Sequence, residues 1–270
     1  MKTRIITAAV LTPLLLLFLI ALPIMCTVLL FGAICAVAAY ELLMGTGLVK
    51  QIRLVIYAGV MAFSTALWSC YGLNFYWALC AVLLFGIALF VELLISKCKL
   101  SLKSLSLTFL AGTLLPFLLC SMVRLFCQPN GRLFVFIPLV IAFLSDTGAY
   151  FVGSFLGKHK LAPEISPNKS VEGALGGIAS AMISMVVFCL IMQLGFSLQV
   201  NYGYALIYGL LGAVAGIFGD LCFSAIKRQS GIKDFSNLMP GHGGVLDRFD
   251  SVIFVAPFVE VFMSLIPLAV

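Results

Sequence analysis

Long runs of apolar residues recur along the whole chain, and short polar segments separate them. A run of about 20 apolar residues is long enough to cross the hydrocarbon core of a bilayer as an α-helix. The chain contains nine such segments, at residues 5–22, 24–43, 52–69, 73–95, 105–126, 132–152, 171–194, 202–225 and 250–269. The first two are joined at Pro23 with almost no loop, either as a tight hairpin or as one long kinked helix. The pattern therefore predicts an all-α integral membrane protein with eight or nine transmembrane helices.

The positions of the basic residues favour nine. Cytoplasmic loops of membrane proteins are enriched in Lys and Arg. With nine helices and a cytoplasmic N-terminus, all but two of the 16 Lys and Arg residues fall on the cytoplasmic side; the exceptions are Arg124 and Arg132. Merging the first two segments would move either the first two basic residues or all the later basic loops to the wrong side. We therefore predict about nine transmembrane helices, a cytoplasmic N-terminus, and two long cytoplasmic loops at about 153–170 and 226–249.

The composition excludes a soluble protein and a nucleic-acid-binding one. The chain is 63% hydrophobic and 10% charged, whereas soluble domains contain about 25% charged residues. The net charge of +6 comes from short loops between spans, where basic residues mark topology and attract anionic headgroups or phosphates. The basic start and first apolar run are also typical of a signal peptide, but no small-x-small cleavage site follows, so we predict a retained helix. The nine cysteines are scattered without C-x-x-C spacing, which favours small buried hydrophobes over zinc ligands or disulfides.

One stretch departs from the apolar pattern: GDLCFSAIKRQSGIKDFSNLMPGHGGVLDRFD, residues 219–250. Asp220, Ser224 and Lys227 are spaced to share one helix face. A glycine-rich bend follows, and Asp247 and Asp250 are then spaced to share a face of the next helix, so we expect the loop to return one carboxylate group towards Asp220 at the membrane surface. A few carboxylate oxygens suit Mg²⁺, and nearby Lys, Arg and backbone N–H groups suit phosphates. The alternative is a solvated loop with surface ion pairs.

The second polar stretch has a similar character. Asp146, Tyr150, Gly153 and Gly157 are spaced along one helix face whose small residues permit close packing. Further on, Lys169 and Ser170 precede a helix start, where phosphate binds readily. The run GSFLGKH, residues 153–159, is not a Walker P-loop, because it has three residues between the glycines and His where Ser or Thr is required.

The remaining charged groups in or near the spans are interpreted as structural. Glu41 and Glu92 lie near cytoplasmic span ends, where water or basic neighbours can satisfy them, and Glu260 in the last span is expected to bond a neighbouring helix. His159 and His242 are expected to face anions or to structure loops, because neither has a second His or Cys nearby.

The segment SAIKRQSGIKDFSNLMPGHGGVLDRFD, residues 224–250, closely resembles the signature of the phosphatidate cytidylyltransferases, also called CDP-diacylglycerol synthases. The upstream segments SDTGAYFVGSFLGKHKL, residues 145–161, and ISPNKSVEG, residues 165–173, are similar to a second conserved region of that family. By motif the resemblance covers about residues 140–255, and the N-terminal half matches only in hydrophobicity and span count.

The resemblance implies a homodimeric membrane enzyme that makes CDP-diacylglycerol and pyrophosphate from CTP and phosphatidate. It also implies a two-metal centre, Mg²⁺ with a monovalent ion such as K⁺, and an active site facing the cytoplasm at the cell membrane. The expected catalytic residues are Asp220, Asp247, Lys227 and Arg248. The expected substrate-binding residues are Lys169, Ser170, Ser224, Arg228, Lys233, His242, Gly243 and Gly244. The expected metal ligands are Asp220 and Asp247, with Asp250 and Asp146 as further candidates.

These implications assign roles to the parts of the chain. Residues 1–270 are expected to form a single membrane domain, in which residues 1–130 serve as a scaffold or for dimerisation and residues 131–270 are catalytic. Two other functions fit the sequence less well. A CDP-alcohol phosphotransferase would need a D-G-x2-A-R…G-x3-D-x3-D pattern, which is absent. An ion-coupled transporter using Asp146, Asp220 and Glu260 as intramembrane carboxylates would need charges at the membrane midplane and broken helices, whereas these carboxylates mostly lie beside the basic loops.

Overall fold

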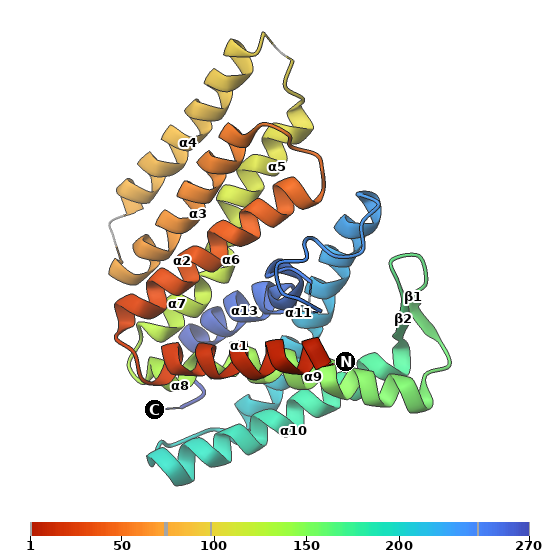
Figure 1. Cartoon of the computed structure of the whole chain (residues 1–270). Helices are drawn as coiled ribbons and strands as arrows, with labels where there is room; N and C mark the ends of the chain where they lie inside the picture. The colour runs from red at the N-terminus through yellow and green to blue at the C-terminus, as the bar shows by residue number, and fades with distance from the viewer. Residues whose placement is uncertain (1, 73–74, 98, 242, 270) are drawn as a thin grey trace. The chain divides into compact units, whose positions relative to one another are not determined.

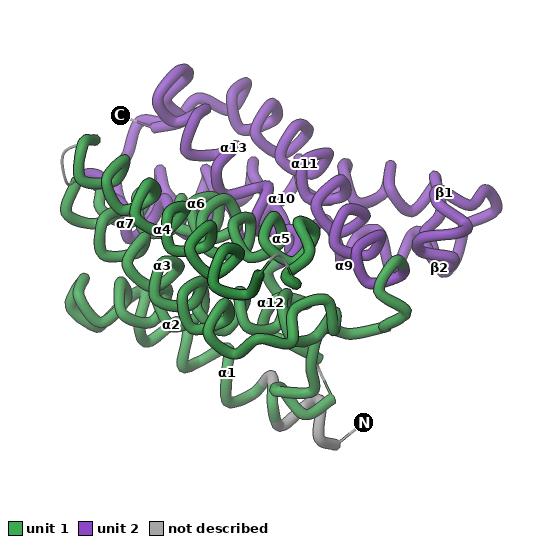
Figure 2. The backbone as a smooth tube through the Cα atoms, turned by 90° about the horizontal axis from the view of Figure 1, so that it is seen from above, with its two compact units in different colours: residues 1–127, 229–249 green, residues 128–228, 250–270 purple. Residues whose placement is uncertain are grey.

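The structure is a computed structural model that describes residues 2–72, 75–97, 99–241 and 243–269 (Figure 1). The chain forms two compact units, residues 1–127 with 229–249 and residues 128–228 with 250–270 (Figure 2). Each unit is therefore assembled from two separate stretches of sequence. The prediction of a single domain over residues 1–270, with a scaffold half and a catalytic half, stays a prediction.

The described residues are mostly helical, and seven helical segments are long and apolar enough to cross a membrane. They are Ile24–Gly45, Ile52–Tyr71, Phe75–Ile95, Leu102–Phe126, Gly131–Leu156, Val171–Phe196 and Tyr202–Gln229. Two shorter apolar helices, Ala9–Ile20 and Val252–Leu265, overlap the first and last predicted segments. A predominantly helical membrane protein is confirmed, whereas the count of nine spans and the cytoplasmic N-terminus stay predictions.

The first unit is a bundle of apolar helices together with residues 229–249, which hold most of the signature and are called the signature loop. Its elements are α1 (Lys2–Ile20), α2 (Ile24–Tyr40), η1 (Glu41–Gly45), α3 (Ile52–Tyr71), α4 (Phe75–Ile95), α5 (Leu102–Gly112), α6 (Leu114–Leu119), α7 (Ser121–Phe126) and α12 (Leu246–Phe249). The helix α2 packs along α3, and α3 packs on α5. The first two predicted segments are separate helices, because α1 ends at Ile20 and Pro23 precedes the first residue of α2. Proline suits that position, since it has no N–H for an intrahelical bond.

The predicted segment 105–126 is interrupted, and its sequence explains how. Pro116 lacks an N–H group, and its ring clashes with the carbonyl four residues earlier in a regular helix. The break falls at that place, between Gly112 and Leu114. A second interruption, at Cys120, is bridged by Arg124, which donates to the Phe117 carbonyl at 3.1 Å.

The second unit packs two long helices closely and adds a small hairpin. Its elements are α8 (Gly131–Phe134), α9 (Phe136–Leu156), β1 (Lys160–Ala162), β2 (Ser166–Ser170), α10 (Val171–Phe196), α11 (Tyr202–Gln229) and α13 (Val252–Leu265). A Cβ atom at Gly173 would lie 2.9 Å from the Ala149 carbonyl oxygen, and one at Gly177 would lie 2.8 Å from that of Ser145. Glycines therefore allow the backbones of α9 and α10 to approach closely.

The structure corrects three details of the predicted polar segments. The loop predicted at 153–170 is partly helical, because α9 continues to Leu156, and the rest includes an antiparallel hairpin that pairs Lys160 with Ser170. The loop predicted at 226–249 begins only after Gln229, where α11 ends. The helix expected to carry both Asp247 and Asp250 is interrupted: α12 ends at Phe249, and Asp250 accepts a hydrogen bond from the next backbone N–H at 2.8 Å. Such local side-chain bonds compete with helix continuation.

Candidate functional site

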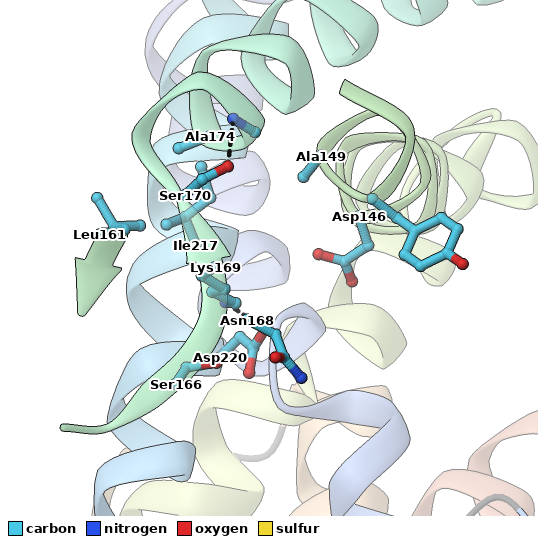
Figure 3. Close-up of a pocket in the computed structure, with 12 residues that line it drawn as sticks. Asp146, Ala149, Leu161, Ser166, Asn168, Lys169, Ser170, Ala174, Ile217 and Asp220 are labelled. Atoms are coloured by element: carbon cyan, nitrogen blue, oxygen red, sulfur yellow. Dashed lines mark hydrogen bonds and ion pairs between the residues drawn. The ribbon is translucent and has the colours of Figure 1, made fainter. Parts of the chain in front are cut away.

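A cavity of about 310 Å³ that contains charged side chains lies in the second unit, among α9, the hairpin, α10 and α11 (Figure 3). Its size is at the lower end of the range for small-molecule sites. It is lined by Asp146, Ala149, Tyr150, Leu161, Ser166, Asn168, Lys169, Ser170, Gly173, Ala174, Ile217 and Asp220. Apolar helices thus surround a group of charged side chains.

An ion pair between Lys169 and Asp220 lines this cavity. The ammonium group of Lys169, on β2, contacts the Oδ2 atom of Asp220, on α11, and about a quarter of each side chain is exposed. The carboxylate of Asp146 points into the same space from α9 (Figure 3). A cation is therefore already favoured beside Asp220, and negative charge lies on two sides of the cavity.

Asp220 is also bonded within its own helix. Its Oδ1 atom accepts a hydrogen bond from the Ser224 hydroxyl at 3.2 Å. This is the pairing that the four-residue spacing predicts, because such residues are neighbours on a helix surface. The bond leaves Ser224 buried beneath the carboxylate, so its predicted contact with a substrate stays a prediction.

Lys227 and Asp250 form a second charged pair in the same unit. The Lys227 Nζ atom lies 4.0 Å from Asp250 Oδ2, and both side chains are nearly buried. Burial, with the like charge of Asp220, raises the pKa of Asp250 to about 7, although Lys227 and the Ser251 N–H oppose the shift; Asp146 adds to it. Two other predicted metal ligands, Asp220 and Asp146, therefore act electrostatically on Asp250.

Three other predicted residues of this unit have structural contacts. The Ser170 hydroxyl accepts a hydrogen bond from the Gly173 N–H at 3.1 Å and so caps the N-terminus of α10. The Arg228 side chain donates to the Ile165 carbonyl at 3.2 Å, which ties the hairpin loop to α11. His159 contacts Glu172 at 2.6 Å and therefore structures the loop, as one of its two predicted roles requires.

The first unit holds the signature loop and the rest of the predicted residues. The Oδ2 atom of Asp247 accepts hydrogen bonds from the Phe235 and Gly244 N–H groups, both at 2.9 Å, and the side chain is buried. Gly243 has a φ of +81°, a backbone conformation that glycine adopts without strain. Lys233 and Arg248 are exposed, and His242 lies outside the described residues.

The carboxylate of Glu41 accepts hydrogen bonds from this loop, a role that the sequence interpretation did not predict. Water or basic neighbours were expected to satisfy it, but it is only 1% exposed and accepts hydrogen bonds from loop groups instead. Glu92, by contrast, accepts a bond from the Tyr57 hydroxyl at 3.0 Å and has Arg53 at 3.9 Å, in line with the expectation. The partners of Glu41 are about 200 residues away along the chain, so no local pattern could have revealed them.

The structure brings together part of the predicted site. Asp146, Lys169 and Asp220 share a cavity, and Asn168, which the sequence interpretation passed over, lines it beside Lys169. Asp247 belongs to the other unit, so its predicted approach to Asp220 stays a prediction. Among the described residues of either unit, no group of three or more His, Cys, Asp or Glu side chains is arranged to hold a metal ion.

The chain is similar to a protein family and to individual known proteins. A model of the cytidylyltransferase family matches residues 2–266. A phosphatidate cytidylyltransferase of Bacillus subtilis (strain 168) is 48% identical over 135 residues, which are 50% of this chain and 49% of that protein. Phosphatidate cytidylyltransferases of Staphylococcus epidermidis (strain ATCC 12228 / FDA PCI 1200) and Staphylococcus aureus (strain COL) are 40% and 39% identical over 136 residues, 50% of this chain and 51% of each protein. The matches thus span about half the length of these curated relatives.

Proposed function

Because the chain belongs to the cytidylyltransferase family, we propose that it transfers the cytidylyl group of CTP to phosphatidate, which gives CDP-diacylglycerol and pyrophosphate. The printed names of the relatives support this substrate pair. The observation that carries the proposal is the cavity in which Lys169 pairs with Asp220 among apolar helices. Such a site suits a reaction between a lipid phosphate and a nucleotide. The family assignment gives no support to the alternative of an ion-coupled transporter.

The proposed reaction is an in-line displacement at the α-phosphorus of CTP. An oxygen of the phosphatidate phosphate forms the new P–O bond, and the bond to the β-phosphate oxygen breaks, so that pyrophosphate leaves with the electron pair. The attacking oxygen is already anionic, so the protein needs no general base. It must instead reduce the repulsion between two anions and stabilise charge that develops on the leaving group. This requirement explains a site built of carboxylates and lysines.

Lys169 and Lys227 are the residues that we assign to the anionic groups. Lys169 lines the cavity and lies at the end of β2, just before α10, whose N-terminus is favourable for phosphate. Lys227 is buried one helical turn beyond Ser224, where a charge acts strongly because little water screens it. Exposed Arg228, Lys233 and Arg248 are proposed to hold the triphosphate or the lipid phosphate.

The carboxylates fit Mg²⁺ as a cofactor. Mg²⁺ is usually held by one or two carboxylates together with water and substrate phosphates, so a cluster of three protein ligands is not required. Asp220 already has a cation beside it, Asp146 lines the same cavity, and Asp250 adds negative charge that burial makes unfavourable. Asp220 and Asp247 are the proposed ligands, with K⁺ as the proposed second ion. When bound, the metal would offset the charge of the phosphates.

The location of the protein follows from the same proposal. Apolar helices anchor the chain as a multi-pass protein of the cell membrane, and the charged cavity is proposed to face the cytoplasm, where CTP is found. Phosphatidate then reaches the site from the bilayer. A homodimer is proposed from the family resemblance.

The test is direct synthesis of the lipid product. Purified chain in detergent is supplied with phosphatidate, labelled CTP and Mg²⁺, and we expect labelled CDP-diacylglycerol and an equal amount of pyrophosphate. Lys169→Met should reduce turnover by about 100-fold or more, since a charge that stabilises the transition state is worth roughly 3–4 kcal/mol. Lys160→Met, a change of the same kind on the exposed strand β1, is the matched control and should remain active. An inactive wild-type protein that binds or transports another solute would overturn the proposal.

A further inference from the structure

The signature loop of the first unit is held by one buried carboxylate from a distant part of the chain. Glu41 is the first residue of η1, a π-helical turn that continues α2. Its Oε1 atom accepts hydrogen bonds from the Ser236 hydroxyl at 2.6 Å and the Val245 N–H at 2.9 Å, and its Oε2 atom accepts one from the Leu246 N–H at 2.7 Å. Both oxygens of the carboxylate are therefore engaged by the loop.

Three successive backbone N–H groups of the loop are taken up by carboxylates. The Gly244 N–H donates to Asp247, and the next two N–H groups donate to Glu41. The Gly244 N–H is therefore already engaged by a carboxylate in the loop itself. The conformation of residues 244–247 is thus fixed by two carboxylates, one of which is the proposed metal ligand Asp247.

The glycine at position 244 is explained by the same contact. A Cβ atom there would lie 2.6 Å from Glu41 Oε2 and 2.7 Å from Oε1, closer than real Cβ contacts. The residue is small so that the carboxylate can reach the amides. Close contact with a nucleotide, the role implied by the family resemblance, stays a prediction for Gly243 and Gly244.

A second contact joins η1 to the loop. Gly45, the last residue of η1, lies so close to the Phe235 carbonyl that a Cβ atom would collide with it. The Phe235 N–H in turn donates to Asp247. The π-helical turn therefore contacts the loop at both of its ends, through Glu41 at Gly244 and through Gly45 at Phe235. The N–H groups of these two loop residues are the ones that donate to the Asp247 carboxylate.

We propose that Glu41 is a positioning residue for Asp247, through which it sets the geometry of the proposed metal site. In the Glu41→Gln variant the neutral side chain would carry only one oxygen, so its NH₂ group would face an N–H donor, and a buried donor would lose its acceptor. In the Glu41→Asp variant the side chain would be too short by one methylene group. Either change weakens the hydrogen bonds that hold the backbone next to Asp247, while the rest of the helical bundle keeps its contacts. The expected effect on catalysis rests on the proposed function, whereas the expected effect on loop structure does not.

The experiment compares Glu41→Gln with Glu92→Gln, the same change at a carboxylate of the same unit that bonds Tyr57 instead of the loop. Hydrogen exchange of peptides covering residues 235–249 reports loop structure without any substrate. We expect exchange of these amides to accelerate by about tenfold or more in Glu41→Gln, since one lost charge-assisted hydrogen bond has that size. Exchange in Glu92→Gln should match the wild type.

Kinetics then separate positioning from general support of the fold. We expect kcat of Glu41→Gln to fall by about 10- to 100-fold, because a small misplacement of a catalytic group causes a rate loss of about that size. The KM for CTP should change little, the Mg²⁺ concentration for half-maximal activity should rise, and excess Mg²⁺ should recover part of the activity. Should Glu41→Gln fail to fold, Ser236→Ala removes one of the three bonds and should shift exchange and Mg²⁺ dependence in the same direction by less.

The outcomes separate the two proposals. Wild-type exchange rates and Mg²⁺ dependence in both Glu41→Gln and Ser236→Ala would overturn the positioning role. A wild-type enzyme that makes no CDP-lipid would overturn the proposed function, while faster loop exchange in Glu41→Gln alone would still support the structural part of the inference.

Discussion

Asp250 gives the second unit a stability that depends on pH, and one substitution removes that dependence. Its pKa rises on folding from an ordinary value of 3.8 to about 7, mainly because the carboxyl group is buried. Stability from such a group is fully present below the unfolded pKa and is lost as pH rises to the folded pKa. The shift is about three units at about 1.36 kcal/mol each, so the wild type should lose up to about 4 kcal/mol of unfolding free energy in this window. The Asp250→Asn variant has no titrating group at this position.

Thermal unfolding in detergent measures this difference. The wild type, Asp250→Asn and Asp234→Asn, a control at an exposed carboxylate, are melted from about pH 4 to about pH 8 with EDTA present. The wild type and the control should lose stability relative to Asp250→Asn up to about pH 7 and change little above it. A gap of roughly 10 °C is expected, since 1 kcal/mol shifts Tm by about 2–4 °C in a chain of this size. Parallel curves for the wild type and Asp250→Asn would refute the reasoning.

Three further predictions address the site and the helix packing. Asp220→Asn should abolish Mg²⁺-dependent nucleotidyl transfer without unfolding the protein, and full activity in a synthesis assay would contradict its assignment as a metal ligand. Arg248→Ala should reduce turnover far more than Arg53→Ala; equal losses in the same assay would indicate a general surface-charge effect. Gly176→Ala should destabilise the protein by about 1–3 kcal/mol, because a Cβ atom there would overlap the Val152 side chain. Gly195→Ala, on the same helix in open space, should be neutral or stabilising in a thermal melt.

The helical membrane architecture could be predicted from the sequence because its cause is local. Each apolar segment must satisfy its own backbone hydrogen bonds in lipid, which only a helix can do within one segment. Every predicted segment accordingly overlaps a long or short apolar helix of the described chain. The bond between Asp220 and Ser224 was predictable for the same reason, since helix geometry alone brings residues four apart together.

The hairpin before α10 was not predictable by this route. Its strands have three and five residues, include Pro167 and show no alternation of apolar and polar side chains. A periodicity argument needs more residues than that. The strands are held instead by pairing with each other and by the bond from Arg228 to Ile165, which depend on how α11 packs beside the loop.

The sequence by itself thus determined the class of protein and the residue types of its polar site, because apolar length and local spacing act within one segment. The tertiary structure alone decided which groups share a cavity and which carboxylate holds the signature loop. Lys169 meets Asp220 from a strand about 50 residues away, and Glu41 meets Val245 across 204 residues. Buried charges take whichever donors the packed chain brings within hydrogen-bonding distance, and that choice is made by packing and not by local pattern.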